Sequence, residues 1–398
     1  MQNIAVLGAA YGDEGKGRIV HDFSKDYDWV VRFNGGANAG HTIYRDGKKY
    51  VHNLMPSFDW RSSKPKAYLG SGMVIDLQQL YKEVIGLHDI NPSYSARVYV
   101  DTDAFVVLPR HKEEDKQVNA HIGSTNRGIG PAYKDKIGRS GTRIVDVLMD
   151  VTHPEHSVIT TLQQMGVIFT NLFKMRSQFK ESSIIFEGAQ GILLDINHGI
   201  YPYVSCSEAT VAGIYSSGFN FIKLDKIYGV AKCYTTKVGE GPFPTEVHGT
   251  LAEDLRERGQ EYGATTGRPR RIGWLDLPAL KYACLKGGIT DLIITKFDIL
   301  NGRKEIPVCT EYQLEPTCPN DFMTAAPKFE NAEGWDDANN LISLIPFIQL
   351  IEKATGFPVS IVTCGVEPTD VFRTQVFTGL NGKNGLKSLL EHLTHSMI

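Results

Sequence analysis

Short runs of apolar residues alternate along this chain with longer segments in which apolar residues recur at helical spacing. Several short runs are apolar throughout, which is typical of strands buried on both faces of a parallel sheet. The predicted strands are Ile4–Leu7, Trp29–Arg32, Arg97–Val100, Ser183–Phe186, Ile227–Ala231, Leu292–Thr295 and Val359–Val362. The clearest helical patterns between them are Leu77–Ile85, Trp274–Leu285 and Asn340–Lys353. This alternation predicts an α/β fold with one large, mostly parallel, twisted sheet flanked by helices, and ligands at the carboxyl ends of its strands.

The chain shows no boundary between domains. Its length suits roughly two or three domains of average size, yet it contains no repeat, no low-complexity segment and no linker rich in proline or serine. We therefore expect residues 1–398 to form a single domain, with elaborated loop and helical subdomains.

Composition and charge exclude several classes of protein. Hydrophobic residues make up 42% of the chain and charged residues 22%, which is ordinary for a globular protein. The formal charge of −3 gives no signal for nucleic-acid binding, and no apolar run approaches the roughly 18 residues that cross a membrane. The N-terminal segment lacks the basic and apolar regions of a secretory signal, and the 6 cysteines form no CxxC pair. We expect a cytoplasmic protein without membrane or nucleic-acid partners.

The first glycine-rich segment follows the first predicted strand and reads GAAYGDEGKGR over residues 8–18. A strand that leads into such a loop and then into a helix forms an anion site, because backbone N–H groups face the ligand. Lys16 adds a positive charge for phosphate, so the segment predicts a P-loop-like nucleotide site, although its spacing differs from that of a Walker A motif. Asp13 is the unexpected residue. A carboxylate in a phosphate-binding loop binds a metal or moves a proton, unless it only caps the following helix.

Four further segments combine glycines with polar side chains. His41 ends the segment RFNGGANAGH and suits a hydrogen-bond donor or general acid at a phosphate. Residues 122–139 carry a basic cluster in a Gly/Pro loop, which indicates either a second anion site or a solvated loop. Gln190 in FEGAQG is either a ligand-binding amide or a turn residue. The arginines of GATTGRPRR, residues 263–271, suit a carboxylate or a phosphate.

A last pair of segments points to guanine. The predicted strand Leu292–Thr295 ends in Thr-Lys-Phe-Asp, and the carboxylate of Asp298 suits the N1–H and 2-amino groups of guanine, which adenine does not match. The turn at Thr363–Gly365 also follows an apolar strand and is placed to close the same base pocket.

Taken together, these motifs resemble the adenylosuccinate synthetase family. The stretches GDEGKG, GGANAGHT, RGIGPAY, FEGAQG, VGEGPFPTE, GATTGRPRR and TKFD follow the family in order over essentially the whole chain. The resemblance implies a GTP-dependent ligase that joins L-aspartate to IMP through 6-phosphoryl-IMP and gives adenylosuccinate, GDP and phosphate. It also implies a requirement for Mg²⁺ and a homodimer.

The resemblance assigns roles to individual residues. Asp13 corresponds to the base that removes the N1 proton of IMP, and also to a Mg²⁺ ligand together with the backbone of Gly40. His41 corresponds to the acid or donor at the transferred phosphoryl group. The implied GTP-binding residues are Gly12, Glu14, Gly15, Lys16, Gly17, Thr42, Lys296, Asp298, Thr363 and Gly365. The implied IMP-binding residues are Asn38, Thr125, Gln190, Ser205, Val238 and, from the partner subunit, Arg139. The implied aspartate-binding residues are Thr265, Thr266, Arg268 and Arg270.

Two departures from the family fall near the implied IMP site. Ser205 stands where threonine is usual and keeps the hydroxyl, and Asn126 stands where glycine is usual and tolerates a positive φ. An alternative within the family is a phage-type enzyme that uses dGMP in place of IMP. Many of those enzymes have a small residue where Asp13 stands, so Asp13 favours IMP. A GTP-binding regulatory protein without catalysis is a second alternative, and the intact set of Asp13, Lys16, His41 and Gln190 argues against it.

Overall fold

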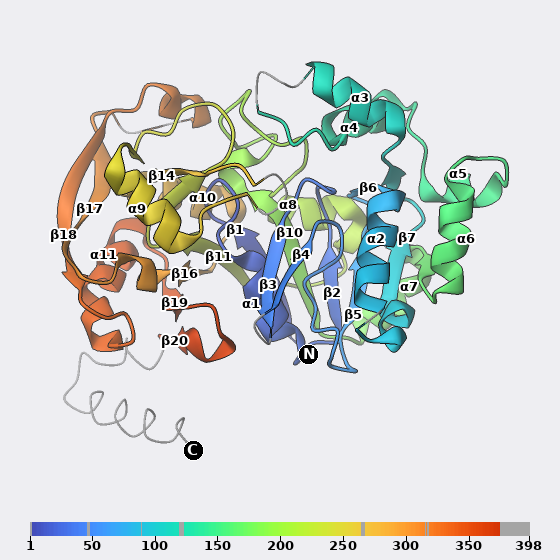
Figure 1. The fold of residues 1–398 in the computed structure, drawn as a ribbon, viewed down its shortest axis with the longest axis horizontal. Coiled ribbons are helices and arrows are strands. Elements are labelled where there is room, and N and C mark those ends of the chain that lie inside the picture. The colour runs from blue at the N-terminus through green and yellow to red at the C-terminus, as the bar shows by residue number, and fades with distance from the viewer. Residues whose placement is uncertain are drawn as a thin grey trace.

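The computed structural model describes residues 2–45, 48–88, 90–118, 123–263, 267–314, 316 and 318–374. Its centre is a 10-stranded sheet in the order β20-β19-β16-β11-β1-β10-β2-β5-β7-β9 (Figure 1). Neighbouring strands are parallel, except that β20 is antiparallel to β19. The strands of this sheet are β1 (Asn3–Gly8), β2 (Trp29–Arg32), β5 (Lys66–Leu69), β7 (Val98–Asp101), β9 (Ile168–Thr170), β10 (Ile184–Gly191), β11 (Lys226–Lys232), β16 (Asp291–Thr295), β19 (Val359–Thr363) and β20 (Val371–Arg373). The predicted large, mostly parallel sheet is confirmed.

Each of the predicted strands is present, with ends that differ by a few residues. Strand β10 runs furthest beyond its prediction, because Glu187 and Gly191 still pair with β1 across a bulge. The pattern did not predict β5, β9 and β20, which lie toward the two edges of the sheet.

Two apolar cores cover the two faces of the sheet, because successive side chains of a strand point to opposite faces. In β1, Ala5 and Leu7 enter one core together with apolar residues of α7, α10 and α11. Ile4 and Val6 enter the other core with apolar residues of α1, α2 and α6. The helices of the structure are α1 (Lys16–Ser24), α2 (Leu77–His88), α3 (Pro109–Val118), α4 (Ile129–Gly138), α5 (Ile144–Met149), α6 (His156–Gln164), α7 (Leu172–Lys180), α8 (Val211–Ile214), α9 (Thr250–Gly259), α10 (Leu277–Gly287) and α11 (Ile345–Thr355).

Two of the predicted helices begin later than their patterns indicated. The helix predicted from Trp274 begins at Leu277, because Leu275 and Asp276 pair with β17 and the Asp276 carboxylate then accepts a hydrogen bond of 3.0 Å from the N–H of Ala279. The helix predicted from Asn340 starts as a 3₁₀ turn at Leu341–Leu344 and becomes α-helical at Ile345.

Smaller sheets and helices surround the central sheet (Figure 1). The hairpin β17–β18 lies at one side of the molecule and the helices α5 and α6 at the other. The smaller sheets contain β3 (His41–Arg45) with β4 (Lys48–His52), β6 (Val74–Ile75) with β8 (Phe105–Val106), β12 (Thr235–Lys237) with β14 (Arg271–Gly273) and β13 (Glu246–Val247), and β15 (Leu275–Asp276) with β17 (Arg303–Tyr312) and β18 (Pro327–Trp335). Among the described helices, none is both long and apolar enough to span a membrane.

Candidate active site

A cavity of about 830 Å³ lies at the carboxyl ends of the central strands. The loops after β1, β2, β10, β16 and β19 all contribute to its walls. This is the edge at which a parallel α/β sheet binds its ligands. The predicted site residues that line the cavity are Gly12, Asp13, Glu14, Gly15, Lys16, Gly17, Asn38, Gly40, His41, Thr42, Thr125, Gln190, Ser205, Val238, Arg268, Arg270, Lys296, Asp298, Thr363 and Gly365. The cavity therefore brings together almost all of the predicted residues that the structure describes.

The loop between β1 and α1 has the backbone of an anion site. Gly12, Asp13 and Gly15 all have a positive φ, of 87°, 60° and 101°. Glu14 turns its carboxylate back onto this loop, where Oε1 accepts hydrogen bonds from the N–H groups of Gly12 (2.8 Å) and Ala10 (3.2 Å). Its other oxygen contacts the Lys16 ammonium at 2.5 Å. The N–H groups and the lysine thus already surround a negative group, which is the arrangement that a phosphate requires.

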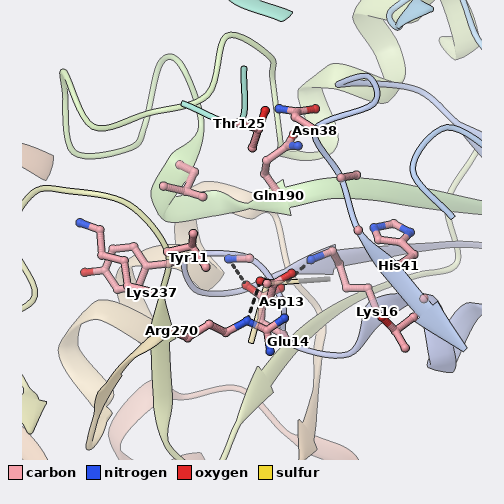
Figure 2. Close-up of a pocket in the computed structure, with 18 of the residues that line it drawn as sticks. Tyr11, Asp13, Glu14, Lys16, Asn38, His41, Thr125, Gln190, Lys237 and Arg270 are labelled. Atoms are coloured by element: carbon pink, nitrogen blue, oxygen red, sulfur yellow. Dashed lines mark hydrogen bonds and ion pairs between the residues drawn. The ribbon is translucent and has the colours of Figure 1, made fainter. Parts of the chain in front are cut away.

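Asp13 does not cap α1. The N-cap residue of that helix is Gly15, and it forms no side-chain capping bond. The Asp13 carboxylate instead accepts a hydrogen bond of 2.8 Å from Nε of Arg270, a residue 257 positions away (Figure 2). The Asp13 side chain is 26% exposed and lines the cavity, so it remains accessible to a ligand.

His41 begins β3 and is held by a buried carboxylate. Its Nδ1 lies 2.5 Å from Oε1 of Glu187 in β10, and Glu187 also accepts a hydrogen bond of 2.8 Å from the N–H of Ser57. Burial alone raises the pKa of Glu187, but His41 and the buried guanidinium of Arg32 outweigh it and lower that pKa to about 2. An ionised Glu187 places the proton of His41 on Nδ1 and fixes the ring, which leaves Nε2 for a ligand.

The side of the cavity that is predicted to bind IMP carries polar atoms that lack partners among the described residues. Nε2 of Gln190 and Oγ of Ser205 are buried and have no hydrogen-bond partner among the described residues. Gln190 has a φ of +58°, which presents its amide from the end of β10. Asn38, Thr125 and Gln190 lie near one another in Figure 2. Because buried polar groups are normally paired, these atoms indicate a place where a ligand binds.

The residues predicted to bind guanine lie together where β16 and β19 end. Oδ1 of Asp298 is buried without a hydrogen-bond partner in the described part of the chain, and burial raises the pKa of this carboxyl. The hydroxyl of Thr363 accepts a hydrogen bond of 3.3 Å from the N–H of Lys296, which joins the two strand ends. Arg18 of α1 donates from its two Nη atoms to the carbonyls of Gly365 and Glu367. Arg18 therefore links helix α1, which follows the glycine-rich loop, to the residues predicted to bind guanine.

The last predicted residues lie at an exposed edge of this cavity, outside it, or outside the described residues. Arg268 lines the cavity from an exposed loop, and its Nη1 lies 3.5 Å from the carbonyl of Gly123. Thr265 and Thr266 fall outside the described residues. Arg139 is exposed at the end of α4 and does not line the cavity of its own chain.

Several polar residues in or behind the wall of the cavity carried no sequence signal strong enough to single them out. Glu187 belongs to the motif FEGAQG, but nothing in that motif singles it out. Its contact with His41 is seen only in the folded structure. Glu261 and Lys232 have no glycine-rich or periodic context, and they meet only because β11 ends beside the loop that follows α9. Lys237 lies within 4.9 Å of the Tyr11 ring centre, near the cavity wall, and burial lowers its pKa to about 7 (Figure 2).

A large, mostly parallel sheet with a glycine-rich, phosphate-type loop and a cavity at the carboxyl ends of its strands is the architecture of a nucleotide-binding α/β protein. The model of the adenylosuccinate synthetase family matches residues 5–179 and 156–372, and the chain belongs to that family. It is 42% identical over 403 residues to the adenylosuccinate synthetase of Petrotoga mobilis, a match that covers 92% of this chain and 96% of that protein.

Two solved structures show the same fold. The fully ligated adenylosuccinate synthetase of Plasmodium falciparum superimposes with a TM-score of 0.84 at 31% identity and covers 94% of this chain and 100% of that chain. The succinoaminodeoxyadenylate synthetase of cyanophage S-2L, solved with dGMP and dATP, superimposes with a TM-score of 0.69 at 24% identity over 94% of this chain and 96% of that chain. At this lower identity the phage enzyme shows a common fold and nothing finer.

Proposed function

We propose that this chain joins L-aspartate to IMP at the expense of GTP and forms adenylosuccinate, GDP and phosphate. The observation that carries the proposal is the position of Asp13, whose carboxylate lies in one cavity with the phosphate loop, His41 and Nε2 of Gln190, an atom without a hydrogen-bond partner among the described residues. An acid–base carboxylate at the meeting point of two nucleotide sites suits phosphoryl transfer from one nucleotide to the other.

In the first step, Asp13 accepts the N1 proton of IMP, and the negative charge moves to the 6-oxygen. This oxygen attacks the γ-phosphorus of GTP, while the bond to the β-phosphate oxygen breaks and GDP leaves. Lys16 and the loop N–H groups stabilise the charge on the transferred group. For Lys16 to do so, the phosphate displaces the Glu14 carboxylate, which now lies 2.5 Å from the ammonium. His41 donates a hydrogen bond to the transferred group from Nε2 once that nitrogen takes up a second proton, since the first proton of the ring lies on Nδ1 against Glu187.

In the second step, the amine of aspartate attacks C6 of the phosphorylated purine, and phosphate leaves with the 6-oxygen. As the C–N bond forms, the amine gives its proton to the departing phosphate. Arg268 and Arg270 bind the carboxylates of aspartate, since an arginine guanidinium matches a carboxylate with two parallel hydrogen bonds. Thr265 and Thr266 are proposed to bind aspartate as well. Lys296, Asp298, Thr363 and Gly365 bind the guanine of GTP.

The site also suits Mg²⁺. Among the residues described, no group of three or more His, Cys, Asp or Glu side chains is placed to hold a metal ion. Magnesium bound to nucleotide phosphates needs only one or two protein carboxylates, because it keeps phosphate oxygens and water as its other ligands. Asp13 and the backbone carbonyl of Gly40 both line the cavity and would supply the protein ligands. The ion would neutralise charge on the transferred phosphoryl group.

We further propose a homodimer in which Arg139 reaches the IMP site of the partner subunit. Arg139 is exposed and has a φ of +63° at the end of α4, outside the cavity of its own chain. Ile137 of α4 is also exposed, at 78%, and Met149 and Val151 at the end of α5 are exposed at 81% and 75%. Large apolar side chains left exposed on a single chain can be covered by a second subunit.

The test is phosphate release in the presence of GTP, Mg²⁺ and L-aspartate, with IMP, GMP or dGMP as the acceptor. The proposal predicts release with IMP and a product with the mass of adenylosuccinate. Release with dGMP and not with IMP would instead support the phage-type reaction and contradict the proposal. Absence of release with every acceptor would support a binding protein.

A further inference from the structure

The buried carboxylate of Glu261 lies between two parts of the active site and has no role in the proposed chemistry. It follows α9 and is completely buried, at 0% exposure. Its oxygens accept hydrogen bonds of 2.8 Å from the ammonium of Lys232, 2.8 Å from the ammonium of Lys296 and 2.5 Å from the hydroxyl of Tyr234. Nη1 of Arg270 donates to it as well.

Two of these partners belong to different ligand sites. Lys296 follows β16 at the predicted guanine pocket, and its backbone N–H is bonded to Thr363. Arg270 uses Nη1 for Glu261 and Nε for Asp13, so its guanidinium bridges the two carboxylates. Glu261 therefore contacts the guanine side directly and Asp13 through a single side chain.

The charges show why this position needs an ionised carboxylate. Burial alone raises the pKa of Glu261, but Lys232, Lys296 and Arg270 outweigh it and hold the pKa well below its ordinary value. A neutral group at the same place would leave cations facing one another with little solvent, which is strongly unfavourable. Arg270, 9% exposed, would then lose the partner that fixes its orientation.

We propose that Glu261 is a positioning residue, which orients Arg270 against Asp13 and Lys296 against the nucleotide base. The inference rests on the proposed function of the same cavity. It predicts that a change at Glu261 affects catalysis together with recognition of GTP and of aspartate, since Arg270 is proposed to bind aspartate. IMP recognition is expected to be unaffected, because no hydrogen bond among the described residues joins the Glu261 carboxylate to Asn38, Gln190 or Ser205.

The test is a double-mutant cycle between Glu261→Asp and Arg270→Lys. Aspartate keeps the charge but is shorter by one methylene, so it weakens the contact with Arg270 without leaving the cations unpaired. We expect E261D to lower kcat about tenfold and to raise KM for GTP by about threefold, with KM for IMP unchanged. In the R270K background, E261D is expected to lower kcat by less than about twofold, because residues that act as a unit are not additive.

The matched control is Asp291→Asn. Asp291 is also a buried carboxylate with a lysine partner, at 2.6 Å from Lys226, but it begins β16 and so lies at the opposite end of the strand from Lys296. D291N is expected to lower the melting temperature and to leave kcat and both KM values unchanged. This separates positioning from a general loss of stability.

Equal losses of kcat from E261D in the wild-type and R270K backgrounds would overturn the inference, and so would an equal rise in KM for GTP and IMP. If E261D does not fold, Tyr234→Phe is the alternative variant, because it removes a single hydrogen bond to Glu261. It is expected to lower kcat and raise KM for GTP by less than E261D, with KM for IMP unchanged. An unchanged kcat and KM for GTP in Y234F would then overturn it. Failure of the wild-type chain to make adenylosuccinate would instead contradict the proposed function.

Discussion

Nε of Arg270 donates a hydrogen bond of 2.8 Å to the carboxylate of Asp13. One residue was predicted to bind aspartate and the other to act as the base, and their contact places the two predicted roles side by side. Arg270 fixes the direction of the Asp13 carboxylate within the cavity, since its guanidinium is itself bound to Glu261. The bound carboxylates of aspartate would therefore meet a cation that already contacts the base.

Replacement of Asp13 by asparagine is expected to abolish turnover without loss of nucleotide binding. Asparagine has nearly the same shape but does not accept the N1 proton, so kcat should fall by about 10²- to 10⁴-fold. Titration with a fluorescent guanine nucleotide would check that binding is kept. Turnover within a few-fold of wild type would contradict the role of Asp13 as the base.

The pair of His41 and Glu187 predicts a pH-dependent contribution to stability. The pKa of Glu187 is lowered from 4.5 to about 2 in the folded chain, so the folded state favours the ionised carboxylate. Its stabilising contribution is complete above the unfolded pKa of 4.5 and is lost as the pH falls toward 2. We expect Glu187→Gln to lower the free energy of unfolding at pH 6, and the difference from wild type to shrink below about pH 4.5.

Urea unfolding of both proteins between pH 6 and pH 3.5 would measure this difference. A difference that stays constant over the whole range would show that Glu187 is not stabilised in its ionised form. The same variant is expected to lower kcat, because a neutral amide in place of the carboxylate would no longer select the Nδ1 proton of His41.

Arg18 predicts a link between the phosphate loop and the guanine pocket. Its guanidinium donates to the carbonyls of Gly365 and Glu367, which shape the loop after β19. Arg18→Met removes both hydrogen bonds and is expected to raise KM for GTP by about tenfold, with KM for IMP unchanged. Arg18→Lys keeps one donor group and should have a smaller effect. Equal changes in both KM values would show that Arg18 serves only the stability of the fold.

The proposed exchange of Arg139 between subunits predicts complementation. Arg139→Leu and Asp13→Asn should each be inactive or nearly so, but a mixed dimer contains one site with an intact Asp13 and a wild-type Arg139 from the partner. Random mixing of equal amounts should restore about a quarter of the wild-type activity, since half of the dimers are mixed and each has one complete site. A tagged subunit would show that mixed dimers have formed. If activity does not recover in those dimers, Arg139 acts in the site of its own chain or in no site.

The sequence predicted those parts of the molecule that depend on local pattern. Apolar runs identified the central strands, and the polar residues that follow them meet because parallel strands end at one edge. Asn126, expected to tolerate an unusual backbone, has a φ of +56°. The predicted start of α10 was wrong because Leu275 pairs with β17, a strand that is distant in sequence. A local pattern of apolar residues does not reveal such pairing.

The contacts within the site were harder to predict for the same reason. The partners of Asp13 and Glu187 come from distant parts of the chain, Arg270 at a separation of 257 residues and His41 at 146. Glycine-rich motifs marked where ligands bind, whereas buried ion pairs such as that of Glu261 with Lys232 have no sequence signature. Their geometry appears only once β11 and the loop after α9 are side by side.

The central claim is that the 6-oxygen of IMP attacks the γ-phosphate of GTP after Asp13 removes the N1 proton. The most direct test uses IMP labelled with ¹⁸O at position 6, together with GTP, Mg²⁺ and L-aspartate, and mass spectrometry of the released phosphate. The account predicts one ¹⁸O atom in each phosphate released. Phosphate that contains only ¹⁶O would contradict it, because the 6-oxygen would then have left by a route that does not involve the γ-phosphate.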